Sequence, residues 1–172
     1  MSIEIRKILS ITISALLLSA CGYKPVSHYT SAMVVEPLYL VVKLSSKEPD
    51  TGLFLKDELR KAIAHRLGIR TSKDEEAPSR LIVLYNNISY TALGYDTDGY
   101  VERYRVNMTT EFRFKSEKEE FVKKIITSHE ADVTQSALES SRAKQEAIKE
   151  STKKAVDIFV AFMAAKAVKN EK

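Results

Sequence analysis

The chain has 172 residues, of which 44% are hydrophobic and 29% are charged, values typical of one compact domain. They exclude two large domains and an unfoldable polar tract, and the single Cys excludes an internal disulfide framework. The formal net charge of +4, from 27 Lys and Arg against 23 Asp and Glu, is too small an excess to indicate nucleic-acid binding.

Residues 1–20 have the pattern of a bacterial secretion signal. Arg6 and Lys7 supply positive charge, and residues 8–18 follow as apolar and small residues without a charge. As a helix this run is about 16 Å long, roughly half the hydrocarbon thickness of a bilayer, and is too short for a permanent span. It closes with Leu-Ser-Ala directly before Cys21, which resembles the lipobox of bacterial lipoproteins. We therefore predict a lipoprotein signal peptide over 1–20.

Cys21 is the predicted lipid-attachment site and the first mature residue. The lipobox resemblance implies an S-diacylglycerol and an N-acyl chain of the palmitate type, and two or three chains hold a protein stably on a membrane. The alternative is an ordinary signal with a cysteine at its boundary by chance. Gly22 stands where Asp favours inner-membrane retention in well-studied bacteria, which implies the outer membrane, periplasmic side. No cofactor other than this lipid is predicted.

The mature chain is predicted to hold a tether, one domain and a short tail. Residues 21–36 contain Gly, Pro, Ser and Thr without a sustained period, as in a lipidated N-terminal tether. A single α/β domain is predicted over 37–168 and a tail over 169–172.

The first half of the domain predicts a strand and a helix. Residues 38–44 are a short Tyr, Val and Leu run that favours a strand. After a turn that begins at Pro49, apolar residues recur every three or four positions from Leu55 to Leu67, and Gly68 supplies a stop signal. This spacing predicts an amphipathic helix.

The second half predicts three strands and a long helix. Residues 81–90 alternate with a slip at Asn86-Asn87, which predicts a β-bulge, and Asp98-Gly99 marks a hairpin turn. From 104 to 114 the alternation is clean, with Tyr, Val, Met, Thr and Phe on one side and polar residues on the other. A weaker strand over 121–133 and a helix over 140–168 follow. The predicted fold is α+β, in the order β-α-β-β-β-α, with two helices on one face of a four-stranded mixed sheet.

No set of residues predicts catalysis or metal binding. His28, His65 and His129 lack metal-ligand spacing, and no phosphate-binding Gly-rich loop or nucleophile motif occurs. Six basic residues remain as candidate contacts: four on the polar side of one predicted strand and two near the start of the last helix. They are Arg103, Arg105, Arg113, Lys115, Arg142 and Lys144. Such groups bind phosphate or carboxylate, and the alternative is a solvated face neutralised by neighbours such as Glu102 and Glu111.

The order of these features resembles the lipopolysaccharide-assembly lipoproteins of the LptE type. Cys21-Gly22-Tyr23 is similar to the mature start of that family, the segment 49–68 to its first helix, and the segment 99–109 to its third strand. The resemblance covers nearly all of the mature chain.

The resemblance implies a non-catalytic outer-membrane lipoprotein that sits in the lumen of the LptD β-barrel, helps the barrel assemble, plugs it and binds lipopolysaccharide. Basic residues in the hairpin after the second strand and before the last helix contact lipopolysaccharide in the family. Here residues 95–99 contain no basic residue, whereas Arg142 or Lys144 can supply the second contact. The alternatives are a periplasm-facing adaptor of another secretion or flagellar complex and a periplasmic hydrolase whose pocket joins distant residues.

Overall fold

The computed structural model describes residues 30, 33–43, 49–134 and 136–170, so the predicted signal peptide and Cys21 lie outside the described residues. The described elements, in chain order, are β1 (Leu38–Lys43), α3 (Pro49–Ala62), the π-helical turn η1 (Ile63–Leu67), β2 (Thr71–Ser72), β3 (Ser79–Tyr95), β4 (Val101–Lys115), β5 (Glu120–Asp132) and α4 (Ala137–Asn170).

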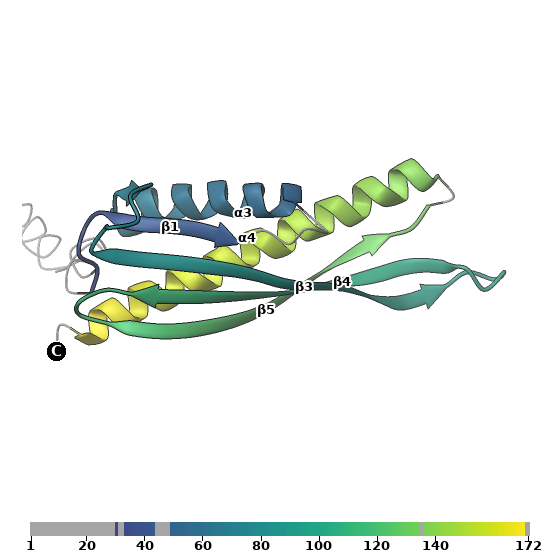
Figure 1. Cartoon of the computed structure of the whole chain (residues 1–172). Helices are drawn as coiled ribbons and strands as arrows, with labels where there is room; N and C mark the ends of the chain where they lie inside the picture. Colours follow the sequence, from purple (N-terminus) through teal and green to yellow (C-terminus); the bar gives the residue numbers. More distant parts are fainter. Residues whose placement is uncertain (1–29, 31–32, 44–48, 135, 171–172) are drawn as a thin grey trace, which may run out of the picture.

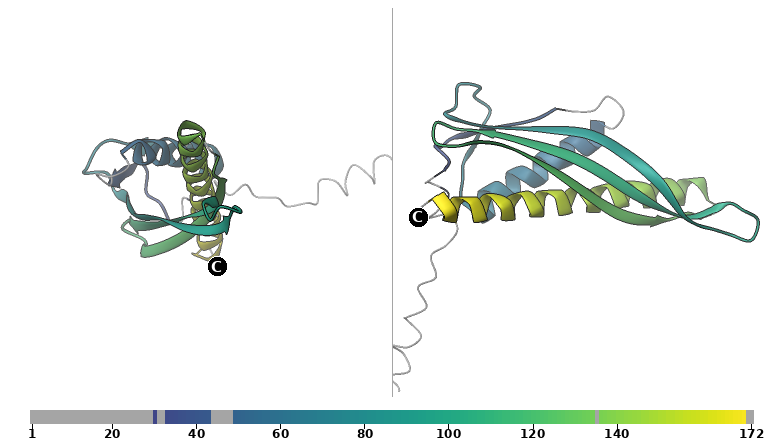
Figure 2. Two further views of the ribbon diagram at one scale, coloured as in Figure 1. Left: turned by 90° about the vertical axis from the view of Figure 1, so that its right-hand side faces the viewer. Right: turned by 90° about the horizontal axis from the view of Figure 1, so that it is seen from below.

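The strands form one mixed sheet in the order β2-β1-β3-β4-β5. β1 is parallel to β2 and β3, whereas β3, β4 and β5 are antiparallel neighbours. The helix α3 packs against β1 and α4, and α4 packs against β4 and β5. Both helices lie on the same face of the sheet, and α4 runs along most of its length (Figures 1 and 2). The other face of the sheet carries no helix in the described part of the chain.

The α+β class is confirmed, but the predicted count of four strands is wrong. The described sheet has five strands because β2 pairs Thr71 with Leu38 and Ser72 with Tyr39 at the side of β1. A strand of two residues is too short to show the alternation by which strands are recognised in a sequence.

Alternating burial along β4 follows the predicted pattern. Val106, Met108, Thr110, Phe112 and Phe114 are buried, Tyr104 is half-buried, and the residues between them are exposed or half-buried. In the neighbouring strand β3 the pairing with β4 shifts between Tyr85 and Asn87, which is the predicted bulge. The bulge keeps Ile88 on the same face as Tyr85, and Ile88 packs against the core.

The main core lies where α3, η1 and α4 meet the sheet. Leu55, Leu59 and Ile63 are buried from the first helix, and Phe112 of β4 stacks on Phe159 of α4 with ring centroids 4.2 Å apart. Gly68 ends the helix in the left-handed conformation, with φ 68°, as its sequence signal predicts. Ile158 is 45% exposed, but most of the apolar C-terminal part of α4 is packed in this core.

The folded part of the chain includes residues that the sequence analysis places in the tether. Met33 and Val34 are buried in the main core, and Thr30 donates a hydrogen bond from Oγ1 to the carbonyl of Leu67 at 2.9 Å. Ser116, in the turn between β4 and β5, donates to the carbonyl of Met33 at 2.8 Å. Packing therefore begins before residue 37.

A second, smaller core lies toward the β3–β4 hairpin. It contains Val106, Ala131, Ala147 and Ile148, with Ile88 and Ala143 packed against it. The hairpin extends past this cluster to the turn at Gly99, which adopts φ 85° (Figure 1). The predicted turn at Asp98-Gly99 is confirmed, and the carboxylate of Asp96 accepts hydrogen bonds from the backbone of Asp98 and Tyr100.

Candidate binding surfaces

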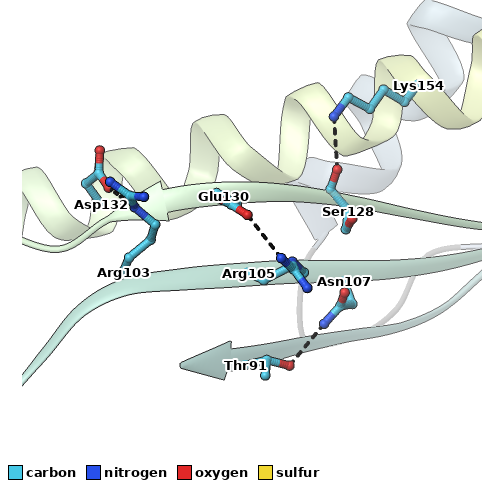
Figure 3. A network of polar contacts seen from close by, with 8 residues as sticks. All are labelled: Thr91, Arg103, Arg105, Asn107, Ser128, Glu130, Asp132 and Lys154. Carbon is cyan, nitrogen blue, oxygen red and sulfur yellow. Dashed lines mark hydrogen bonds and ion pairs between the residues drawn. The ribbon is translucent and has the colours of Figure 1, made fainter. Parts of the chain in front are cut away.

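Four of the six basic candidates lie on the uncovered face of the sheet. The alternation of β4 places Arg103, Arg105, Arg113 and Lys115 opposite the buried face. The Nε of Arg103 is 2.7 Å from a carboxylate oxygen of Asp132, and the Nη2 of Arg105 is 3.1 Å from one of Glu130 (Figure 3). Both carboxylates stand directly across from the arginines on β5.

The other two β4 cations are also paired. The Nε of Arg113 is 2.6 Å from Glu111 on the same strand, and the Nζ of Lys115 is 3.1 Å from Glu120 on β5. Each of these four cations has a carboxylate partner. Glu111 is the neighbour that the sequence analysis named.

The carboxylates near Arg103 affect the pKa of its guanidinium group. The hydrogen bond and charge of Asp132 raise the pKa of Arg103 above its ordinary value, with smaller contributions from Glu130 and Glu102. The ion pair of Arg103 with Asp132 presents a polar but nearly uncharged surface.

Uncharged polar groups continue this surface. The amide of Asn107 donates to the hydroxyl of Thr91 at 3.2 Å (Figure 3). From the covered side, Lys154 of α4 reaches the edge of β5, where its Nζ donates to the carbonyl of Ser128 at 3.0 Å. The same Nζ lies 3.3 Å from Nδ1 of His129. We call the face made by the outward residues of β3, β4 and β5 the polar sheet face.

The remaining two candidates lie elsewhere. Arg142 is exposed near the start of α4. The Nζ of Lys144, two residues further along α4, lies 4.6 Å from the ring centre of Tyr104 and 5.6 Å from that of Tyr90, a cation–π arrangement on the helix-covered face. The six candidates are therefore divided between two faces and do not form one site.

Sequence reasoning missed the two tyrosines that hold Lys144. Tyr90 and Tyr104 meet edge to face, with ring centroids 6.4 Å apart. Both were recognised as members of strands, but the alternation alone did not show that a lysine of a distant helix docks on them. The signal available was that both aromatics fall on the inward side near the end of their strands, where a helix must cover them.

The β3–β4 hairpin tip carries acidic and aromatic groups. Asp96 and Asp98 lie in the turn, and Tyr95 and Tyr100 beside it are 63% and 73% exposed. A hollow at the tip is lined by Asp96, Asp98 and Tyr100 together with Glu102 and Tyr104. No basic residue lines it, in keeping with the sequence of the turn.

The described part of the chain holds no group of three or more His, Cys, Asp or Glu side chains placed to bind a metal ion. Within that same part, neither helix combines the length and the apolar composition that a bilayer crossing requires.

Comparison with known protein families identifies one match. The family described as "LptE: Lipopolysaccharide-assembly" matches residues 41–163, which is most of the chain. A comparison with curated protein sequences gives no match.

Several solved structures share the fold. Rare lipoprotein B from Shewanella oneidensis has a TM-score of 0.57 and 20% identity, over 78% of this chain and 99% of that one. An uncharacterized lipoprotein B from Nitrosomonas europaea has a TM-score of 0.59 and 15% identity, over 86% and 93% of the two chains. A minor lipoprotein from Acinetobacter baumannii has a TM-score of 0.50 and 15% identity, over 76% and 95%. At these identities the similarity shows the fold.

Proposed function

Because the chain belongs to the LptE family of lipopolysaccharide-assembly proteins, we propose that it is an outer-membrane lipoprotein that assembles with the LptD β-barrel, plugs its lumen and assists lipopolysaccharide transport. This is a family of non-catalytic lipoproteins, so the protein acts by binding. In this proposal the acyl chains on Cys21 hold it on the periplasmic side of the outer membrane.

The polar sheet face is the observation that supports the plug. Both helices cover one side of the sheet, and the part of the other side around Arg103, Arg105 and Asn107 carries paired charges and hydrogen-bonded polar groups. The lumen of a large outer-membrane barrel is polar, and ion pairs such as Arg103–Asp132 and Arg105–Glu130 enter such a lumen with their charges already paired.

Affinity purification of the lipidated chain from a detergent extract tests the partner. We expect LptD to copurify and its folded form to be lost when the chain is depleted. A free monomer, together with an unchanged barrel level in the depleted strain, contradicts the proposal. A photocrosslinking residue in place of Arg103 tests the contact surface, because a crosslink to a different secretion or flagellar complex supports the adaptor alternative.

Lipopolysaccharide contact is proposed at Arg142 and Lys144. Arg142 is exposed, and Lys144 is held on two aromatic rings, so both cations are positioned beside the second core where α4 begins. Phosphate groups of a glycolipid bind such cations through charge-assisted hydrogen bonds.

Charge reversal tests this contact. In the soluble Cys21→Ala form, Arg142→Glu together with Lys144→Glu should weaken capture of lipopolysaccharide by about tenfold, since two charge-assisted contacts become repulsive. Lys149→Glu together with Lys169→Glu makes the same change in net charge at two exposed positions of α4 and should leave capture unchanged. Equal capture by the two double variants places the contact elsewhere.

A further inference from the structure

Strand β5 is an edge of the sheet. Among the described strands, in the order β2-β1-β3-β4-β5, only β4 borders it, and it is 13 residues long, whereas the strand at the opposite edge has two residues. An edge strand presents backbone N–H and C=O groups that another extended chain can pair with.

The pairing register shows which residues present those groups. The N–H of Val133 donates to the carbonyl of Glu102 at 2.7 Å, and these two residues continue the register in which Asp132 stands opposite Arg103. In an antiparallel pair, directly opposed residues alternate between hydrogen-bonded and non-hydrogen-bonded pairs. The odd-numbered residues of β5 therefore bond to β4, and the even-numbered residues direct their backbone groups to the free edge.

The contact of Lys154 agrees with the even-numbered backbone groups facing the free edge of β5. It also limits how much of that edge is open to a partner. The Nζ of Lys154 bonds to the carbonyl of Ser128, an even-numbered residue, at 3.0 Å (Figure 3). The edge is thus capped by a side chain at Ser128, and from Glu120 to Ile126 no side chain of the described residues caps it. We call this stretch the open edge.

The open edge has a distinct side-chain pattern on the uncovered face. Val122 and Ile126 are 62% and 69% exposed, which makes them the most exposed aliphatic side chains of the described sheet. Between them, Lys124 stands opposite Glu111, but the carboxylate of Glu111 bonds to Arg113 at 2.6 Å. Lys124 makes no ion pair with any residue that the structure describes. The pattern is apolar, cationic, apolar.

We propose that the open edge of β5 accepts an extended segment of a partner protein as a further strand, with an acidic residue opposite Lys124 and apolar residues opposite Val122 and Ile126. This pairing satisfies the outward backbone groups, covers the two exposed aliphatic side chains and gives Lys124 a counter-charge. It goes beyond the proposed function, because it depends on neither lipopolysaccharide nor the basic residues of α4.

A second copy of the chain is a poorer occupant. Antiparallel pairing of the whole open edge with itself, as a two-fold axis requires, sets Lys124 opposite Val122 and Glu120 opposite Ile126. Each charge then faces an aliphatic side chain, so the complementarity favours a different sequence.

A tethered probe strand tests the proposal in the full mature chain, purified in detergent. The probe Thr-Val-Thr-Glu-Thr-Val-Thr follows Lys172 through a Gly/Ser linker. The last part of α4 lies close to the start of β5, because the Nζ of Lys166 lies 2.5 Å from Glu119. Tethering raises the local concentration enough to detect a weak strand addition. The readout is amide hydrogen exchange at Val122, Lys124 and Ile126.

We expect the glutamate probe to slow exchange of these amides by about tenfold relative to the chain without a probe, and a probe with lysine in place of glutamate to do so much less. In the Lys124→Glu variant, whose thermal melting serves as the folding control, the preference should reverse. Absence of protection by the glutamate probe overturns the proposal. So does equal protection by both probes, or concentration-dependent protection of the probe-free chain, which indicates a second copy at this edge.

Discussion

At the scale of single residues, two buried threonines on the same face of the sheet have different hydrogen-bonding states. Thr127 of β5 donates from Oγ1 to the carbonyl of Ser151 in α4 at 2.9 Å. Thr110 of β4 is fully buried, and its Oγ1 has no hydrogen-bond partner among the described residues. A buried hydroxyl without a partner destabilises the folded state, whereas a bonded one contributes modestly to stability.

Substitution by valine should therefore have opposite effects at these two positions. Thr110→Val removes an unpaired hydroxyl at nearly constant volume and should raise the free energy of unfolding by about 1 kcal/mol. Thr127→Val removes the hydrogen bond from β5 to the carbonyl of Ser151 in α4 and should lower the free energy of unfolding by about 1 kcal/mol. Urea denaturation of the two variants measures both changes. A destabilised Thr110→Val variant contradicts this description of the core.

The ion pairs of the polar sheet face show how far residue contacts can be predicted. The chain turns over residues 116–119, and a turn of that length sets Lys115 opposite Glu120 and, from there, Arg105 opposite Glu130. The pairs follow from the register, so the sequence contained the information. The contact of Lys144 with Tyr104 did not follow in this way, because it depends on where α4 docks on the sheet.

At the scale of elements, the start of α4 differs between prediction and structure. The helix begins at Ala137, earlier than the predicted 140. Its start has a capping signal, in which the Oγ of Ser136 accepts from the N–H of Glu139 at 3.4 Å. The segment that leads into the helix is fixed to its first turn, because the N–H of Thr134 donates to the Oγ of Ser140 at 3.0 Å. The Ser-x-x-Glu spacing was present in the sequence, but the periodicity that defined the helix begins later.

Removal of the cap should shorten α4 from its first turn. Ser136→Ala should lower the free energy of unfolding by about 1 kcal/mol, because the N–H of Glu139 loses its acceptor. Ser136→Asp supplies another acceptor and a charge that suits a helix N-terminus, so it should retain the stability of the original residue. Thermal melting followed by circular dichroism compares the two. Equal loss in both variants shows that the cap is not the cause.

At the scale of the whole molecule, the sheet is held by two cores of unequal size. The main core joins α3, η1, α4 and the sheet around Phe112 and Phe159, whereas the second core rests on Val106, Ala131, Ala147 and Ile148. Local openings occur where few apolar contacts hold the structure. The two ends of α4 should therefore differ in stability.

Hydrogen exchange should show this difference directly. Amides in 101–106 and 140–148 should exchange through partial openings, with a lower free energy than amides in 108–114 and 155–163. Ile148→Ala should lower protection in the first two segments, and Phe159→Ala should lower it in all four, because a large cavity in the main core costs about 3–5 kcal/mol. A single free energy of exchange along the whole chain contradicts the division into two cores.

The whole-molecule prediction from sequence was correct in class and wrong in detail. The clean alternation on β4 and the helical spacing from Leu55 to Leu67 predicted both strands and helices, which is the α+β class. The match of residues 41–163 to the LptE family agrees with the family resemblance seen in the sequence. The fifth strand and the burial of Met33 depend on contacts between segments far apart in the sequence. Local patterns do not encode such contacts.

Thr30 and Met33 contact the end of the sheet at which β3 begins, and this position determines how far the other end of the sheet lies from the N-terminal segment. The chain enters the fold beside the β4–β5 turn, and β3 runs away from that point for 17 residues, about 56 Å at the usual rise of a strand. Acyl chains on Cys21, a short stretch upstream, would hold one end of this rod at a leaflet surface. The tyrosine-bearing tip lies at the opposite end of β3 from this point, and the length of the strand exceeds the thickness of the hydrocarbon layer of a bilayer.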